Sequence, residues 1–234
     1  MELMRSDITI PCLMEPRLEN FKPRSDSLIQ SLLFIRNLAI KLRLSQSCVA
    51  TAQTYFHTFT INNSHLKYDN LLIAGACLFL SSKVLEQTRH IDILCRKFYD
   101  ERSEIRMTLN PRLQVPPLSD SMLAGLKQNI LQCEFAVLEA LCFNVEISLP
   151  YSFISSFVSN LELNVYQKQD LLKIASNFAN DSFRVPIFLQ KSAENVAAAC
   201  LFLASRYLSL GLEIAADQET VEAILEIYKS NINI

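Results

Sequence analysis

Glycine is scarce in this chain: only Gly75, Gly125 and Gly211 occur among 234 residues. Tight β-hairpins and phosphate-binding loops both depend on glycine, because their backbones adopt conformations that other residues disfavour. The scarcity therefore argues against a strand-rich fold and against a phosphate-binding loop. It favours an all-α protein.

The chain also lacks an excess of positive charge and any long hydrophobic run. Its formal net charge is −2 and its pI is about 6.0, whereas surfaces that bind nucleic acid are usually basic. No apolar run reaches the roughly 18 residues of a membrane-spanning helix. The start, MELMRSDITIPC, lacks the apolar core of a signal peptide. We therefore expect neither direct nucleic-acid binding nor a membrane segment.

The residue patterns that support catalysis or metal binding are missing as well. His57, His65 and His90 are the only histidines, and no two of them are four residues apart, so a zinc-binding helix is excluded. No GxSxG, P-loop or paired-carboxylate motif occurs. The seven cysteines form no CxxC motif and are typical of small core residues in a reducing compartment. We expect no cofactor, no metal and no enzymatic activity.

What the chain does contain is a repeated phrase. ACLFLSSK occupies residues 76–83, and ACLFLASR occupies residues 199–206, with six of eight letters identical. Repeats spaced by more than 100 residues indicate duplicated domains rather than a solenoid. The segment 71–80, which includes most of the first copy, is apolar on every side, as expected for the buried central helix of a bundle. Each copy ends in a cation.

Hydrophobic periodicity predicts helices on both sides of each copy. The predicted helices are 26–43, 45–58, 69–86, 91–99 and 120–141, followed by 149–161, 166–180, 192–208 and 217–231. Their expected N-caps include Asp26 or Ser27, Ser45 and Ser148, and Pro150 suits a first turn.

Three segments fall outside this helical pattern. Residues 1–24 contain three prolines and are interpreted as an extended arm. Residues 99–119 combine charges with further prolines and are predicted to be a long loop. Little chain separates the third and last helices of the second half, so we expect its fourth helix to be missing or reduced.

One carboxylate falls on an apolar helix face. At about 100° per residue, the stripe of helix 120–141 includes Ile130, Val137 and also Glu134, whereas Glu139 points the opposite way. A carboxylate in an apolar face needs a partner or loses its charge. Glu134 could reach water at the edge of the stripe, pair with a residue of this chain such as Lys83, or contact another protein.

Lys83 and Arg206, which end the two copies, also have an ordinary explanation. A cation in the last turn of a helix interacts favourably with the negative end of the helix dipole, by about 0.3–1 kcal/mol. From the pattern alone, both could be helix-end charges without a binding role.

Several longer stretches resemble a known family. LIAGACLFLSSKVLE, IDILC and LQCEFAVLEALCFNVEISLPYSFI closely resemble the cyclin box. FANDSFRVPIFLQKSAENVAAACLFLASR resembles the second box of the transcription-type branch, which includes cyclins L, K, T and Q. The resemblance covers roughly residues 27–231. It implies two tandem boxes, one at 25–146 with five helices and a shortened one at 147–234 with four to five helices.

The resemblance also implies a function and a site. In the family, the first box binds a cyclin-dependent kinase as a heterodimer and rotates the kinase helix that carries the catalytic-site glutamate into its active position. The charged positions that match are Lys83 and Glu134. The apolar positions that match, and the one acidic neighbour, are Leu80, Val84, Phe143, Val145 and Glu86. The family often has Lys-x-Glu-Glu where this chain has Lys83-Val84-Leu85-Glu86, so the first glutamate is absent.

The expected function is thus a nuclear regulatory subunit of a kinase that acts in RNA polymerase II transcription or RNA processing. An alternative of a different class is a module like the general transcription factor TFIIB, which uses the same duplicated fold on DNA. The DNA-binding relatives need basic helices beside each box, and this chain has none that is obvious.

Overall fold

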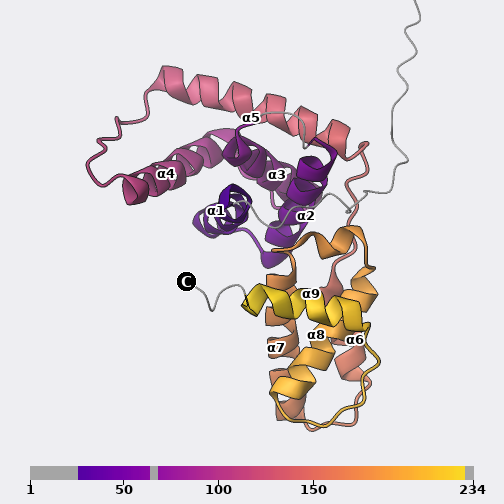
Figure 1. Ribbon diagram of the computed structural model, residues 1–234. Coiled ribbons are helices and arrows are strands. Elements are labelled where there is room, and N and C mark those ends of the chain that lie inside the picture. Colours follow the sequence, from indigo (N-terminus) through magenta and orange to yellow (C-terminus); the bar gives the residue numbers. More distant parts are fainter. Residues whose placement is uncertain (1–25, 64–67, 230–234) are drawn as a thin grey trace, which may run out of the picture.

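The computed structural model describes residues 26–63 and 68–229. Within these ranges the chain forms nine α-helices and one 3-10 helix, and no strand. The prediction of an all-α fold is confirmed. The helices form two bundles that follow one another along the chain, and the second bundle lies against the α2 side of the first (Figure 1). The predicted arm at 1–24 lies outside the described residues.

The first bundle has the five helices that were predicted. They are α1 (Asp26–Leu42), α2 (Gln46–Asn62), α3 (Asn70–Val84), α4 (Ile91–Leu109) and α5 (Asp120–Ala140). Helix α3 packs against all four others, and every residue from Ile73 to Ser82 is buried. The first copy of the repeated phrase is therefore the centre of this bundle.

Helix α4 approaches α3 closely at Gly75. A Cβ atom built at Gly75 would lie 2.8 Å from two ring carbons of Phe98. The Phe98 ring is itself fixed by an edge-on contact with Phe34, at 5.0 Å between centroids. Glycine at this position is what allows α4 to pack onto the central helix.

Helix α4 is longer than predicted, and the loop assigned to residues 99–119 is wrong for its first half. The helix continues to Leu109, which leaves residues 110–119 as the connection to α5. Three of the charges that suggested a loop, Glu101, Arg102 and Glu104, have partners outside α4. Glu101 is buried, pairs with Lys41 of α1 at 2.7 Å and accepts a hydrogen bond from Asn37 at 2.9 Å. Contacts with α1 therefore stabilise a segment whose own composition favours a loop.

The second bundle consists of α6 (Pro150–Ser159), α7 (Val165–Ser182), α8 (Ala193–Tyr207) and α9 (Gln218–Lys229). A short 3-10 helix, η2 (Pro186–Leu189), lies between α7 and α8. Helix α8 carries the second copy of the phrase and packs against α6, α7 and α9. Residues 208–217 form no helix, in agreement with the expected loss of the fourth helix.

Of the predicted caps, the one at Ser45 is confirmed, whereas Asp26 and Ser27 lie inside α1 and do not precede it. The Ser45 side chain accepts a hydrogen bond from the backbone N–H of Cys48 at the start of α2. At α6 the N-cap is Leu149, whose side chain makes no capping hydrogen bond, so the assignment of Ser148 as the cap is wrong. Pro150 occupies the first turn as expected, where its missing N–H has no cost.

A buried contact joins the two bundles. Nε2 of His57, on α2, lies 2.9 Å from the carbonyl oxygen of Phe183 at the end of α7. His57 is 7% exposed, and burial lowers its pKa to about 4. The ring is thus neutral at physiological pH, and its Nε2–H donates to the carbonyl.

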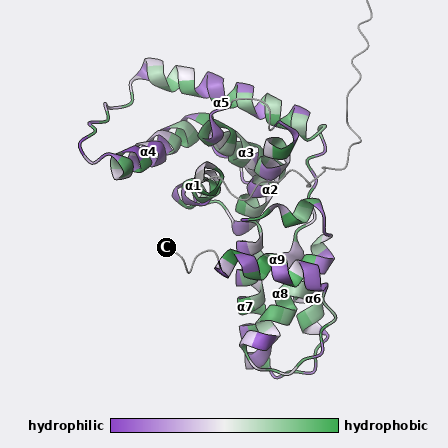
Figure 2. Cartoon of the chain, in the orientation of Figure 1, coloured by the Kyte–Doolittle hydropathy of each residue, from purple (hydrophilic) through white to green (hydrophobic). Residues whose placement is uncertain are grey.

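The hydropathy pattern agrees with two separate cores. Hydrophobic and hydrophilic residues alternate along α5, which covers the first bundle (Figure 2). Each bundle has its own cluster of buried apolar side chains.

Among the described helices, none is long and apolar enough to cross a membrane.

Most of the described cysteines are core residues, as predicted. Cys48, Cys77, Cys95 and Cys200 are buried, and Cys133 is half-buried. Cys142 is exposed, because it follows the end of α5, so the interpretation as a core residue is wrong there.

Candidate protein-binding site

The structure brings Lys83 and Glu134 together. Lys83 lies in the last turn of α3, and Glu134 lies in α5. The Lys83 ammonium donates to both carboxylate oxygens of Glu134, at 2.6 and 2.9 Å. Because α5 packs directly along α3, two residues separated by about 50 positions in the sequence form one ion pair.

Glu134 occupies the apolar face of α5, as its position in the stripe predicted. The neighbours Ile130 and Val137 are fully buried, and the Glu134 side chain is only 10% exposed. Glu139 is exposed, as expected for the opposite face. The pair with Lys83 satisfies the buried carboxylate, so the interpretation in which Glu134 simply reaches water is wrong.

Lys83 remains accessible although it is paired. Its side chain is 38% exposed, and its ammonium lies 4.0 Å from the centroid of the Phe79 ring, a cation–π contact. An ammonium has three N–H donors, and two of them point to one carboxylate. The third can serve an acceptor on another molecule.

The predicted apolar neighbours differ in how much surface they offer. Phe143 is 62% exposed, and Val84 and Val145 are half-buried. The Val145 carbonyl accepts a hydrogen bond from the buried Tyr55 hydroxyl at 2.6 Å, which fixes the backbone after α5. Leu80 is 5% exposed and belongs to the core, where it supports the surface from below.

Glu86 lies just beyond the end of α3. It is exposed and has a φ of 57°, the left-handed conformation that commonly follows a helix C-terminus. Its side chain makes no ion pair with any other described residue. Glu86 is therefore placed close to Lys83 along the chain but takes no part in the Lys83–Glu134 pair.

One exposed aromatic residue was missed by the sequence analysis. Phe135 follows Glu134, is 56% exposed, and packs edge-on against Phe143 with 6.4 Å between ring centroids. Leu131, one turn earlier, is 47% exposed. The available signal was that both are large apolar residues outside the buried stripe of α5. We call Lys83, Val84, Glu134, Phe135 and Phe143 the α3–α5 site.

The second copy of the phrase lacks an equivalent ion pair. Arg206 ends α8, and its guanidinium lies 5.3 Å from the centroid of the Phe202 ring. No carboxylate among residues 26–63 and 68–229 pairs with it. In the described structure Arg206 is a helix-end charge and nothing more.

The α3–α5 site has groups suited to contact with another protein. An ion pair surrounded by apolar side chains can exchange hydrogen bonds with the backbone of another protein. No group of three potential metal ligands occurs in the part of the chain that the structure describes. His57 is buried between the bundles and His90 caps α4, while His65 lies outside the described residues.

Comparisons with known protein families assign a separate family model to each half of the chain. Residues 24–146 match the model of the cyclin N-terminal domain, which covers more than half of the chain. Residues 144–231 match the model of the transcription factor TFIIB repeat. The duplication inferred from the repeated phrase is thus found again, with a different model for each copy.

Similar curated proteins are cyclins. Cyclin-L1 of Xenopus laevis is 33% identical over 178 residues, which make up 76% of this chain and 35% of that protein. Cyclin-L2 of Homo sapiens is 32% identical over 178 residues, 76% of this chain and 33% of that protein. The chain therefore spans about a third of the length of these relatives.

Among solved structures, a chain of the yeast RNA Pol II CTD kinase CTDK-1 complex has a similar fold. The TM-score is 0.71 at 18% sequence identity, over 89% of this chain and 66% of that chain. At this identity the similarity establishes the fold: two cyclin-type helical bundles in tandem.

Proposed function

The chain belongs to the cyclin family, as its sequence motifs indicated, and from this premise we propose that it is the regulatory subunit of a cyclin-dependent protein kinase. In this role it binds and activates the kinase and has no catalytic activity of its own. Its similarity to Cyclin-L1 and to a chain of a polymerase-tail kinase complex supports a kinase in RNA polymerase II transcription or RNA processing. That work takes place in the nucleus, which is our proposed location.

The observation that carries this proposal is the Lys83–Glu134 pair, in which Glu134 is buried and the Lys83 side chain is 38% exposed. We propose that the α3–α5 site packs against the kinase helix that bears the catalytic-site glutamate. Lys83 donates its remaining N–H to a backbone carbonyl of the kinase, and Glu134 holds the ammonium in place. The apolar contact then rotates the helix so that its glutamate can pair with the ATP-binding lysine.

The aromatic residues supply the apolar part of that contact. Phe135, which follows Glu134 in the chain, and Phe143 expose two neighbouring rings. Exposed rings packed against each other lose little conformational freedom on binding, and aromatic residues are enriched among those that dominate binding energy. In this proposal residues 25–146 form the box that binds the kinase, and residues 147–234 form the second box.

The test is co-purification followed by activation. The tagged chain is purified from its native cell, and the co-purifying kinase is identified by mass spectrometry. The same kinase is then prepared alone and assayed on a polymerase-tail peptide with and without the chain. We expect the chain to raise the phosphorylation rate by at least about tenfold, since the Lys–Glu pair of the kinase is needed for catalysis. A kinase equally active without the chain would contradict the proposal.

A second candidate function is binding of DNA in the manner of TFIIB. The match of residues 144–231 to the TFIIB repeat is the observation that favours it. The net charge of −2 weighs against it, since phosphate neutralisation needs an excess of Lys and Arg. DNA binding that falls steeply with rising salt would support this candidate, and its absence at low salt would eliminate it.

A further inference from the structure

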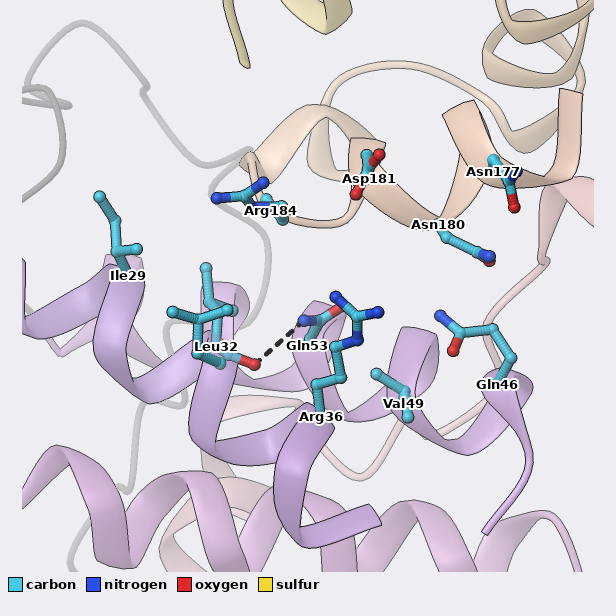
Figure 3. A pocket seen from close by; sticks show the side chains of 11 residues that line it. Ile29, Leu32, Arg36, Gln46, Val49, Gln53, Asn177, Asn180, Asp181 and Arg184 are labelled. Atoms are coloured by element: carbon cyan, nitrogen blue, oxygen red, sulfur yellow. Dashed lines mark hydrogen bonds between the residues drawn. The ribbon is translucent and has the colours of Figure 1, made fainter. Parts of the chain in front are cut away.

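A cavity of about 400 Å³ lies between the two bundles. One wall comes from α1 and α2, and the other comes from α7 and from Arg184, which follows it (Figure 3). None of its lining residues belongs to the α3–α5 site. Cavities between domains are common places for ligands, and this one has polar groups from both bundles.

Two arginines line the cavity without partners. Arg36 comes from α1, and Arg184 follows the end of α7. Figure 3 shows both at the gap between the bundles. Neither guanidinium forms an ion pair or a side-chain hydrogen bond with another residue in the described part of the chain. A guanidinium presents a rigid fork of N–H donors that fits a carboxylate or a phosphate.

A buried acceptor in the same wall also lacks a partner. Gln53 is 4% exposed, and its Nε2 donates to the Leu32 carbonyl at 3.3 Å. Its Oε1 is buried and accepts no hydrogen bond from any described residue. A buried amide oxygen is rarely left unpaired in proteins. The cavity therefore has a place for an N–H donor as well as for an anion.

Two further polar groups of the cavity, both on α7, already have partners. Asp181 accepts a hydrogen bond from the Tyr228 hydroxyl at 2.8 Å, and Asn180 accepts one from the Tyr151 hydroxyl at 2.9 Å. Arg36, Arg184 and Asp181 together give the lining a net charge of +1. This charge matches one carboxylate, whereas a phosphate carries nearly two negative charges and would exceed it.

We propose that this cavity is a docking site for an acidic segment of a partner protein, bound through one Asp or Glu side chain. The carboxylate accepts from Arg36 and Arg184, and Gln53 Oε1 accepts a backbone N–H of the same segment. The buried Leu32 and the exposed Leu33 provide an apolar wall for a neighbouring side chain. This site is additional to the proposed kinase surface and does not depend on it.

The experiment uses the full chain and a pair of blocked tripeptides that differ only in charge. Acetyl-Leu-Glu-Leu-amide and acetyl-Leu-Gln-Leu-amide are titrated while the arginine Nε–Hε signals are followed by NMR. We expect saturable binding of the Glu peptide with a Kd of about 1 mM or tighter, shifts at Arg36 and Arg184, and about tenfold weaker binding of the Gln peptide. The variants Arg36→Ala and Arg184→Ala should each bind the Glu peptide about tenfold more weakly.

The controls separate this site from a general attraction to acidic peptides. Arg112→Ala removes an exposed arginine in the connection between α4 and α5, outside the cavity, and should bind as the unmodified chain does. Unchanged thermal unfolding of all three variants shows that they fold. Equal binding of the Glu and Gln peptides, tighter binding of a phosphoserine peptide, unaffected Arg36 and Arg184 variants, or no saturation by about 5 mM would each overturn the proposal.

Discussion

The two central helices, α3 and α8, end in the same backbone geometry. The residue after each C-cap has a left-handed conformation, with φ of 57° at Glu86 and 53° at Ser209. At the next residue, a backbone N–H donates back to a carbonyl of the last turn, at 2.8 Å after α3 and 3.0 Å after α8. The duplication thus preserves the way the helix terminates, beyond the letters of the repeated phrase.

The two helices differ in what covers their last turn. Lys83 and Arg206 both lie over a phenylalanine of the repeated phrase, Phe79 or Phe202. Only Lys83 also meets a carboxylate, because α5 presents Glu134 to it. The same helix end therefore becomes a candidate binding site in the first bundle and remains a plain helix end in the second. The neighbouring helix makes the difference.

The fourth helix explains a second difference between the copies. Gly75 in α3 gives room to Phe98 of α4, and the matching position of α8 is Ala198. Between α8 and α9, residues 208–217 form no helix in place of α4, so nothing there requires the loss of a side chain. Glycine is needed at residue 75 because α4 packs there, and not because the helix itself prefers glycine.

The substitutions with the largest expected effect compare the two cations that end the repeated phrases, Lys83 and Arg206. Lys83→Ala and Glu134→Ala should each weaken kinase binding by tens- to thousands-fold, because truncating one member of a charged pair that the interface buries costs about 2–5 kcal/mol of affinity. Arg206→Ala and Glu139→Ala should change it by less than about twofold, since exposed charges contribute little. Pull-down and titration against the purified kinase measure these effects, and circular dichroism checks that helicity is intact.

Full binding by a Lys83→Ala/Glu134→Ala double variant would show that the site is elsewhere. Equal losses for Lys83→Ala and Arg206→Ala would show that the two copies are functionally equivalent.

The buried His57–Phe183 contact between the two bundles should make the free energy of unfolding depend on pH. His57 has a pKa of about 4 in the folded chain and about 6.5 when unfolded. Below pH 6.5 the unfolded chain takes up a proton that the folded chain does not. The free energy of unfolding should therefore fall by about 3 kcal/mol between pH 6.5 and pH 4, and this contribution is constant outside that window.

Urea denaturation at a series of pH values measures this loss. His57→Gln can still donate to the Phe183 carbonyl but does not titrate, so it should remove most of the slope. His90→Gln, at an exposed histidine, should retain it. An unchanged slope in His57→Gln would assign the pH dependence to other groups.

Exchanging the residues of the copies at the glycine position should destabilise both bundles for different reasons. Gly75→Ala places a Cβ against the fixed Phe98 ring, and overpacking of this kind costs about 1–3 kcal/mol. Ala198→Gly loses only helix propensity, about 1 kcal/mol. Thermal unfolding of the two variants compares them. A stabilised Gly75→Ala variant would mean that α4 can move away at little cost.

The exposed ring of Phe135 in the first bundle should contribute to kinase binding, whereas an exposed ring at the end of α8 in the second bundle should not. Phe135→Ala removes a ring that is 56% exposed and touches only Phe143 in the ring contacts of the structure. It should weaken kinase binding by about tenfold and leave the unfolding temperature nearly unchanged. Tyr207→Ala, at an exposed ring in the last turn of α8, is the matched control. Equal behaviour of the two would exclude Phe135 from the interface.

The structure could be predicted from the sequence where local signals determine it. It could not be predicted where contacts between helices determine it. Eight of the nine helices follow from periodicity and caps, and Glu134 was placed in the buried stripe from its angle alone. The second half of α4 could not be found, because Lys41 on another helix stabilises Glu101 there. The same limit left the partner of Glu134 open: only the packing of α5 on α3 selects Lys83.

The smallest expected effect returns to the shared helix ends. Glu86 and Ser209 both adopt left-handed backbone conformations that cost side-chain-bearing residues about 1 kcal/mol and glycine almost nothing. Glu86→Gly and Ser209→Gly should therefore each raise the free energy of unfolding by about 0.5–1 kcal/mol, by similar amounts if the two ends are equivalent. Titration of the same variants with the kinase then separates the effect of the backbone conformation from the effect of the Glu86 side chain. If Glu86→Gly stabilises the chain but weakens binding where Ser209→Gly does not, the Glu86 carboxylate is part of the interface, and if both bind normally, it is only a helix terminus.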